Sequence, residues 1–368
     1  MIQGDAVMTD DDVTAALQRA VSEAVGRHVT AVTDVRREPL DYDAFLAHRV
    51  VTRLRGSAIV DGAPVPWSLI EKRTDAPAWA SPYLLDNSRR ELEAYSSGLL
   101  DAIAPGIRAP RPYGTLLEPG GRITLWLEEI HHEGPRPLDA QSILTAAHNL
   151  GGLGGRWFGR DLAEPWFFTG WIDRHTQVGA VGQGLATVRR RHRQALDRLG
   201  DRLGFTERLI LGQPRLRRIL ELLPQTLCHH DAVGANVFST ADGETVLIDW
   251  ESVGPGTVGA DLASLLFASV RRGDASASVV APLLDDALHA YADGLWADGA
   301  SIGFDDVRRG FDAAVALRWK LAVDVAACIE RGEAPRRGSL PDEAPETATE
   351  ELILLVDLLL DSADRVLD

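Results

Sequence analysis

The pattern of apolar residues changes near residue 130, and this change limits the fold more than any other feature of the sequence. Three segments before it alternate apolar and polar residues, as β-strands do: 28–38, 47–60 and 66–73. The segment 114–130 has two apolar runs around the turn EPGG, which is typical of a hairpin. Helical spacing occurs at 10–26 and 87–103. We therefore expect an antiparallel sheet with helices in residues 1–130.

The chain after residue 130 is mainly helical in its pattern. Seven segments have helical spacing: 139–152, 183–203, 205–222, 260–272, 277–296, 305–331 and 347–366. Short β segments are expected only at 226–250. The glycines of GGLGG (151–155) predict the end of a helix, and the Pro- and Gly-rich stretch 332–346 predicts a mobile loop. The fold class is α+β, with one lobe at 1–130 and a helical lobe at 131–368.

Composition excludes several classes of protein. The net charge of −16 argues against a nucleic-acid binder and against docking on an anionic membrane, and it is compatible with a cationic substrate. The two cysteines, Cys228 and Cys328, form no close-spaced pair, which excludes a cysteine-based zinc site and argues against a disulfide framework. The N-terminus has no signal-peptide pattern, and no apolar run is long enough to span a bilayer. We expect a cytoplasmic enzyme.

The chemistry is concentrated in TLCHHDAVGANVF (226–238) and the following VLIDWE (246–251). The second stretch returns as a hairpin, which brings Asn236 and Asp249 to the same edge. One carboxylate and one amide oxygen suit Mg²⁺, which uses few protein ligands together with substrate phosphates. Asp231, on the entering loop, can accept a proton from a hydroxyl group. For each residue alone, capping of a loop is the competing interpretation. The adjacent histidines also permit a metal-hydrolase interpretation, but no further histidine motif supports it.

The order H-x-D-x-x-x-x-N, then I-D-W-E, resembles the aminoglycoside phosphotransferase family, which has the protein-kinase-like fold. The resemblance implies a catalytic role for Asp231, metal ligation by Asn236 and Asp249, and a structural role for His229. The stretch GPGTVGADLASLL (254–266) is similar to a later family motif, in which Asp261 braces the catalytic loop.

The N-terminal half resembles the same family. Lys72 ends a strand pattern in WSLIEK, where the family has its nucleotide-phosphate lysine, and Glu91 lies on the next helix, where the partner of that lysine is found. Glu93 is the rival for this pairing. LWLEEI (125–130) resembles the family hinge, so the backbone at Glu129 and Ile130 is expected to hold adenine.

The sequence also departs from the family pattern. No glycine-rich nucleotide loop is present in 37–49, His230 replaces the glycine of H-G-D, and Val233 stands where many members have histidine. The resemblance implies a phosphotransferase that uses ATP or GTP with Mg²⁺. The alternative, based on the missing glycine loop, is a catalytically weak kinase-like nucleotide-binding module.

The acceptor is expected to be a small molecule with a hydroxyl group, such as an aminoglycoside, a sugar or an amino alcohol. A cationic acceptor is compatible with six acidic residues of the helical lobe: Asp285, Asp286, Asp293, Asp298, Asp305 and Asp306. The aromatic stretch EPWFFTGWIDRH (164–175) is interpreted as core, with a wall of the acceptor pocket as the alternative. RRRHR (189–193) is interpreted as a solvated helix face, with an anionic acceptor site as the alternative. The sequence gives no indication of the oligomeric state.

Overall fold

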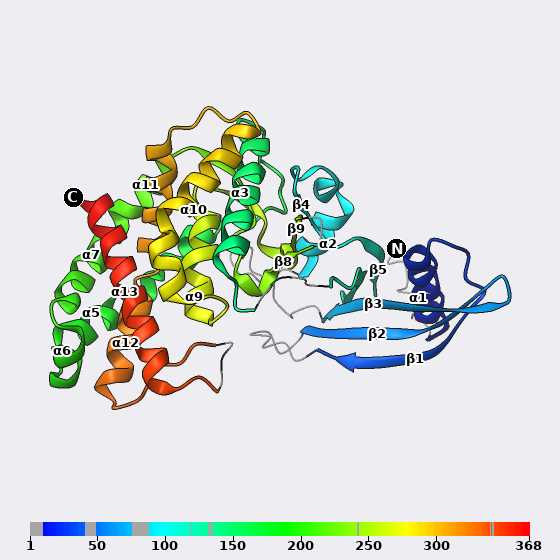
Figure 1. The fold of residues 1–368 in the computed structure, drawn as a ribbon, viewed down its shortest axis with the longest axis horizontal. Coiled ribbons are helices and arrows are strands. Elements are labelled where there is room, and N and C mark those ends of the chain that lie inside the picture. Colours follow the sequence, from blue (N-terminus) through cyan, green and yellow to red (C-terminus); the bar gives the residue numbers. More distant parts are fainter. Residues whose placement is uncertain are drawn as a thin grey trace, which may run out of the picture. The chain divides into compact units, whose positions relative to one another are not determined.

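A computed structural model describes most of the chain and divides it into two compact units. The described residues are 10–40, 49–75, 88–118, 120–131, 134, 136–240, 243–338, 340 and 342–368. One unit comprises Met1–Ala102 with Ala109–His131, and the other comprises Ile103–Arg108 with His132–Asp368 (Figure 1). Most of the glycine-free segment 37–49 lies outside the described residues.

The first unit is built on a five-stranded antiparallel sheet. The strand order is β1-β2-β3-β6-β5. The sheet strands are β1 (Ala31–Pro39), β2 (Arg49–Val60), β3 (Ala63–Thr74), β5 (Pro112–Leu117) and β6 (Ile123–Leu127). The helices are α1 (Asp10–Val25), α2 (Ser88–Ser96) and the short 3₁₀ helix η1 (Leu99–Ala102). The expected antiparallel sheet, its leading helix and its final hairpin are all confirmed.

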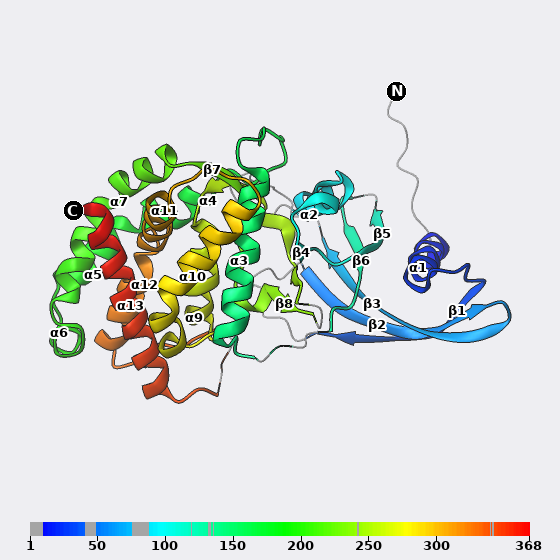
Figure 2. The same cartoon turned by 45° about the horizontal axis from the view of Figure 1, so that its top comes forward.

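The core of this unit forms between α1 and the sheet (Figure 2). Helical spacing places Leu17 and Val21 on one face of α1, and both are buried. They belong to the same apolar cluster as Leu54 of β2, Trp67 of β3 and Trp126 of β6. Because each strand points alternate side chains to the same face, three strands together supply a continuous surface for the helix.

The second unit is mainly helical, as expected. Its α-helices are α3 (Ala140–Trp157), α4 (Trp171–Thr176), α5 (Val181–Arg189), α6 (Arg193–Leu199), α7 (Arg202–Leu222), α8 (Ala260–Ala263), α9 (Ser269–Arg272), α10 (Ala277–Ala297), α11 (Phe304–Ala316), α12 (Lys320–Glu330) and α13 (Pro345–Leu367). The π-helix η5 (Ser264–Ala268) joins α8 to α9, and η2 (Val178–Ala180) precedes α5. None of the helices that the structure describes is long and apolar enough to cross a membrane.

Short β segments of this unit surround the predicted motif. They are β4 (Ile107–Arg108), β7 (Gln225–Cys228), β8 (Val237–Ser239), β9 (Thr245–Leu247) and β10 (Gly254–Thr257). β7 pairs with β10, while β9 lies between β8 and β4. The parallel pairing of β4 with β9 explains why Ile103–Arg108 belongs to the second unit, although it precedes residue 130.

Two long predicted helices are each divided in the structure. The pattern at 183–203 becomes α5 and α6, because Arg191 between them has a positive φ of 46°, which a helix does not tolerate. The pattern at 305–331 becomes α11 and α12. In 305–331 the apolar spacing continues through the break, so the pattern alone could not reveal it.

The expectation that GGLGG ends a helix is wrong. All five residues lie inside α3, which continues to Trp157. A Cβ atom at Gly151 would lie 1.9 Å from the carbonyl oxygen of Tyr291, and one at Gly155 would lie 2.3 Å from that of Leu295. Gly294 of α10 approaches the backbone of α3 in the same way. The glycines therefore allow the backbones of α3 and α10 to touch (Figure 1).

The described residues between α12 and α13 have no regular secondary structure, Pro345 and Glu346 already belong to α13, and Arg337 anchors this stretch. This arginine is only 6% exposed. Its guanidinium forms ion pairs with Glu343 and Glu351 and donates hydrogen bonds to the carbonyl oxygens of Val270 and Ala275.

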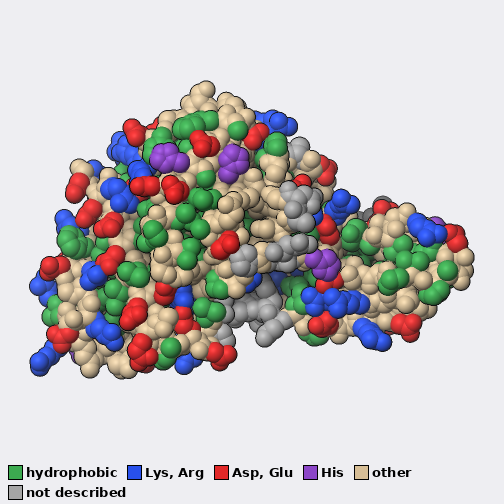
Figure 3. Space-filling view, viewed as in Figure 1, with side chains coloured by type: hydrophobic (Ala, Val, Ile, Leu, Met, Phe, Trp, Pro, Cys, Tyr) green, Lys and Arg blue, Asp and Glu red, His purple; other side chains and the backbone are tan. Residues whose placement is uncertain are grey.

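The surface of the second unit carries acidic and basic side chains next to one another, as the face in Figure 3 shows. Many of them form surface ion pairs, such as Arg202 with Asp357 and Arg308 with Asp285.

Gly151→Ala should destabilise the protein by at least about 2 kcal/mol, because the new methyl group would overlap a backbone carbonyl that has no room to move. Chemical unfolding monitored by circular dichroism measures the change. Gly204→Ala in α7 is the matched control: a Cβ atom there meets nothing within 4 Å. That variant should be unchanged or more stable by up to about 1 kcal/mol. Equal effects of the two substitutions would contradict the close approach of α3 and α10.

Candidate active site

The loop that carries the predicted catalytic residues is held by one carboxylate. Asp261 lies in α8 and is 2% exposed. Its two oxygens accept hydrogen bonds from the backbone N–H groups of His229, at 2.7 Å, and His230, at 2.8 Å. Burial raises the pKa of the Asp261 carboxyl to about 6, although these hydrogen bonds oppose the rise. At neutral pH it is thus an ionised acceptor that fixes the point where β7 enters the loop.

His229 has a structural place and a defined tautomer. Its Nδ1 accepts a hydrogen bond from the backbone N–H of Asp231 at 3.3 Å, so the ring proton must be on Nε2. Nε2 lies 3.0 Å from the carbonyl oxygen of Ile248 and donates to it. The ring also packs edge-on against Trp250. A fully buried neutral ring therefore connects the loop to the strand that leads to Asp249.

His230 occupies a backbone conformation that favours glycine. Its φ is 63°, in the left-handed region, which explains why the related pattern has glycine here. A non-glycine residue in this region costs about 1–2 kcal/mol. The imidazole compensates with contacts: Nε2 lies 3.1 Å from the carbonyl oxygen of Pro255, and the ring stacks on Trp171 at 5.3 Å. Burial lowers the pKa of His230 to about 3, so the ring is neutral.

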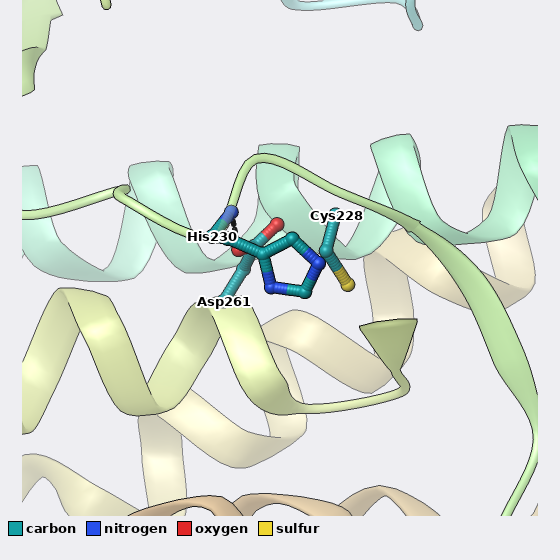
Figure 4. A group of neighbouring side chains, drawn as sticks. All are labelled: Cys228, His230 and Asp261. Atoms are coloured by element: carbon teal, nitrogen blue, oxygen red, sulfur yellow. Dashed lines mark hydrogen bonds between the residues drawn. The ribbon is translucent and has the colours of Figure 1, made fainter. Parts of the chain in front are cut away.

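The side chains of Cys228, His230 and Asp261 converge within 4.8 Å, a spacing that metal ligands also show (Figure 4). Each is already engaged: Asp261 accepts two backbone hydrogen bonds and His230 faces a carbonyl. Burial raises the pKa of the Cys228 thiol well above its usual value, which disfavours the thiolate that a metal requires. A Cβ atom at Gly256 would lie 2.4 Å from the His230 ring. These contacts identify the group as a packed structural cluster.

Asp231 and Asn236 are joined directly. The Nδ2 group of Asn236 donates to both the backbone oxygen and the Oδ2 atom of Asp231, each at 2.9 Å. These two bonds use both amide hydrogens, so the Oδ1 atom of Asn236 is presented as an acceptor. The 3₁₀ turn η3 (Gly234–Asn236) makes this approach possible, and Ser269 accepts a hydrogen bond from the N–H of Gly234. An oriented amide oxygen beside carboxylates is a donor set that suits a hard divalent cation.

Asp249 follows the returning strand β9 and is 7% exposed. Its backbone φ of 68° is again left-handed, and the 3₁₀ turn η4 (Trp250–Ser252) begins directly after it. Strained backbone of this kind is concentrated at functional sites. Burial, together with the negative charge of Asp249, raises the pKa of Asp231 to about 6, while the positive charge of Arg174 opposes that rise.

In the first unit, Lys72 and Glu91 form a buried ion pair. The Nζ atom of Lys72 lies 2.5 Å from Oε2 of Glu91, and both side chains are less than one tenth exposed. Glu93, the rival considered from sequence, instead pairs with Arg89 on the surface. A strand lysine held by a helix glutamate has a fixed position.

The predicted hinge residues lie just after β6. The side chain of Glu129 does not extend into open space, because it pairs with Arg53 at 2.6 Å and with Arg55 at 3.1 Å. Ile130 is half-buried. The glutamate side chain thus secures the sheet, so that only the backbone of Glu129 and Ile130 remains for recognition of a base. Their role in binding adenine stays a prediction.

Sequence reasoning missed Arg174. It lies on α4, three residues after the Trp171 that stacks on His230, and it is half-buried. The aromatic stretch before it packs on the loop as well, since the ring of Phe168 lies edge-on to that of His230, with 6.0 Å between the ring centroids. The stretch 164–175 thus packs as core residues do, and this packing is compatible with a wall of the acceptor pocket.

The charged run 189–193 lies elsewhere. Arg189 and Arg190 form surface ion pairs with Glu207 and Glu330, in keeping with a solvated helix face.

Asp231→Asn should stabilise the protein at pH 7 by about 1–3 kcal/mol. The folded-state pKa of about 6 exceeds the usual 3.8, so the ionised form opposes folding above pH 6, and no such effect remains below about pH 4. Urea unfolding at pH 4 and pH 7 measures the gain. Asp286→Asn, on the exposed side of α10, is the control and should change little. Equal effects of Asp231→Asn at the two pH values would contradict the raised pKa.

Comparison with known proteins identifies a family and several structures that are similar to this chain. A profile of the Phosphotransferase enzyme family matches residues 61–300. No curated protein matches the sequence. Among solved structures, the chain is similar to an aminoglycoside phosphotransferase from Alicyclobacillus acidocaldarius, with a TM-score of 0.51 and 14% identity over 100% of this chain and 96% of that chain. At this identity the likeness shows the fold alone.

Two further structures are similar at lower scores. One is an ethanolamine kinase from Plasmodium vivax, with a TM-score of 0.46 and 11% identity over 97% of this chain and 89% of that chain. The other is an aminoglycoside phosphotransferase from Streptomyces rimosus, with a TM-score of 0.43 and 17% identity over 85% of this chain and 100% of that chain. The family profile covers more than half of the chain and includes Lys72, Asp231, Asn236 and Asp249. The protein belongs to the phosphotransferase enzyme family and is a small-molecule kinase with the protein-kinase-like fold.

Proposed function

We propose that the protein transfers the γ-phosphoryl group of ATP, with Mg²⁺, to a hydroxyl group of a small molecule. The observation that carries this proposal is the coupling of Asp231 to Asn236. One amide group holds the carboxylate through its hydrogens and presents its oxygen on the other side. A base and a metal ligand are thereby fixed relative to each other by a single side chain.

In the proposed reaction, the acceptor hydroxyl donates a hydrogen bond to the ionised carboxylate of Asp231. The hydroxyl oxygen forms a bond to the γ-phosphorus as the bond between that phosphorus and the β–γ bridging oxygen breaks. The hydroxyl proton passes to Asp231, and ADP keeps the electron pair of the broken bond. Asp249 and the Oδ1 atom of Asn236 would hold Mg²⁺, which supplies neutralisation of the phosphate charges.

The nucleotide would be anchored by the first unit. Lys72, positioned by Glu91, would contact the α- and β-phosphates, and the backbone at Glu129 and Ile130 would bind the base. GTP is a second candidate donor, since the side chain of Glu129 is paired with Arg53 and Arg55. We place the enzyme in the cytoplasm, where nucleoside triphosphates are available and where the free thiols of Cys228 and Cys328 would stay reduced.

Asp231→Asn should reduce turnover by at least about 10²-fold, because the amide cannot accept the hydroxyl proton. The measurement is ATP consumption with a panel of hydroxylated acceptors. Nucleotide binding, followed by thermal shift with ATP and Mg²⁺, should persist. In the wild type, the rate should fall about tenfold for each pH unit below about 6, since only the ionised carboxylate acts as a base. Binding of ATP without turnover in the wild type, across the whole panel, would favour a nucleotide-binding module instead.

Lys72→Met and Glu91→Gln should act on the same step. Lys72→Met should raise the ATP concentration required and reduce turnover, and Glu91→Gln should give a milder form of the same defect, because the glutamate only positions the ammonium. The double variant should be little worse than Lys72→Met, as is usual for residues that act as a unit. Glu93→Gln is the matched control on the same helix. Multiplying defects, or a defect in Glu93→Gln alone, would refute the assignment.

A further inference from the structure

Of the arginines that lie around the catalytic loop in the second unit, Arg136 donates hydrogen bonds to the carbonyl oxygens of Gly234 and Val237, and three others have no part in the proposed reaction. They are Arg174 on α4, Arg271 on α9 and Arg318 between α11 and α12. Arg174 and Arg318 are half-buried, and Arg271 is exposed. They come from segments far apart in the sequence, so only the tertiary structure brings them together.

Direct contacts with the loop fix each of these segments. α4 is held on the loop by the stacking of Trp171 on His230, and its last residue, Thr176, accepts a hydrogen bond from the indole of Trp319, next to Arg318. Arg318 itself donates to the hydroxyl of Ser264 at 3.1 Å, just after the helix that carries Asp261.

α9 contacts the same loop at another point. Its first residue, Ser269, accepts a hydrogen bond from the N–H of Gly234 at 2.8 Å, and Arg271 follows two residues later. The neighbouring Arg272 is different, since it pairs with Asp274 at 3.2 Å.

These arginines differ from the structural arginines of the same unit. Structural arginines have close carboxylate partners: Arg202 with Asp357, Arg190 with Glu330, Arg337 with Glu343 and Arg365 with Asp312. Among the described residues, the guanidinium of Arg174 has neither an ion pair nor a hydrogen bond. Arg318 donates only to a hydroxyl and to the carbonyl of Ala314. Arg271 has a distant pair with Asp324, at 3.9 Å, which Lys320 shares.

The positive charge is therefore only partly compensated. Burial, together with the charges of Arg174 and Arg271, lowers the pKa of Arg318 to about 9. Burial together with Arg318 and Arg174 also lowers the pKa of His175 well below its usual value. Two of the nearby carboxylates have other tasks, because Asp261 holds the backbone and Asp231 is assigned to the acceptor hydroxyl, while the charge of Glu251 acts on Arg174. Converging guanidinium groups in such surroundings are suited to bind carboxylate or phosphate.

We propose that the acceptor carries an oxyanion, a carboxylate or a phosphate group, which Arg174, Arg318 and Arg271 bind while Asp231 holds its hydroxyl. This inference rests on the proposed kinase function and narrows the acceptor class. A cationic acceptor is compatible with the negative net charge of the chain, whereas the arginines indicate an anionic acceptor. Of the six acidic residues that favoured a cation, Asp285 forms an ion pair with Arg308 on the surface of α10.

The test is ATP consumption with hydroxylated acceptors that differ in charge, among which each neutral member shares its skeleton with two anionic members. The neutral members are glycerol and glucose, the anionic members are glycerate, glycerol 3-phosphate, gluconate and glucose 6-phosphate, and the cationic members are ethanolamine and kanamycin. We expect kcat/KM to be at least about tenfold higher for a carboxylate or phosphate member than for its neutral partner. Comparison of the two anionic types shows which oxyanion is bound. Higher kcat/KM with neutral or cationic members would overturn the inference and leave the kinase function intact.

Arg174→Gln should lower the preference for the anionic acceptor about tenfold or more, mainly through KM. Arg190→Gln, in a surface pair with Glu330, is the matched control and should not change this preference. An unchanged preference in Arg174→Gln would overturn the inference.

A binding measurement tests whether the arginines bind an oxyanion, even if the acceptor panel does not contain the substrate. Sulfate is added to the protein saturated with ADP and Mg²⁺, and its thermal shift is compared with that of sodium chloride at equal ionic strength. We expect an excess shift with sulfate that is lost in Arg174→Gln and kept in Arg190→Gln. No excess in the wild type, or the same excess in Arg174→Gln, would refute the oxyanion site. Failure of the proposed function is recognised separately, by equal ATP consumption in the wild type and in Asp231→Asn.

Discussion

The acceptance of two backbone hydrogen bonds by the Asp261 carboxylate is the interaction on which the catalytic loop depends. Consecutive N–H groups can point to one side only if the chain turns sharply, and the left-handed backbone of His230 provides that turn. Asp231 then leaves the turn in a fixed direction. Its N–H bonds to His229, and its carboxylate meets Asn236. A single buried charge thus sets the geometry of the proposed base and the proposed metal ligand.

Replacement of the usual glycine by His230 has changed the surroundings of this turn. The imidazole needs space, which the absence of a side chain at Gly256 supplies, and it needs a partner, which Trp171 supplies. Through Trp171, the ring brings α4 onto the loop, and with it Arg174. The histidine at position 230, which departs from the family pattern, is therefore linked through Trp171 to the position of Arg174. A family member with glycine at this position would lack the ring on which α4 packs here.

Several residues of the candidate site destabilise the folded protein. Asp231 and Asp261 both have a pKa raised to about 6 by burial, so both ionised forms oppose folding at neutral pH. Two non-glycine residues, His230 and Asp249, have left-handed backbone. The close packing of α3 on α10 and the buried network around Arg337 are among the interactions that keep the second unit folded despite these costs.

The sequence by itself determined the fold class, the order of strands and helices, and the family. These follow from local periodicity and from ordered motifs, which survive without knowledge of the tertiary contacts. It could not show that GGLGG continues a helix, because the reason lies in the backbone of α10, more than a hundred residues away. It could not find the arginines either, since Arg174, Arg271 and Arg318 belong to no common motif and have no shared spacing. Only the tertiary structure decided which charges surround Asp231, because electrostatic interactions depend on distance in space and not on separation along the chain.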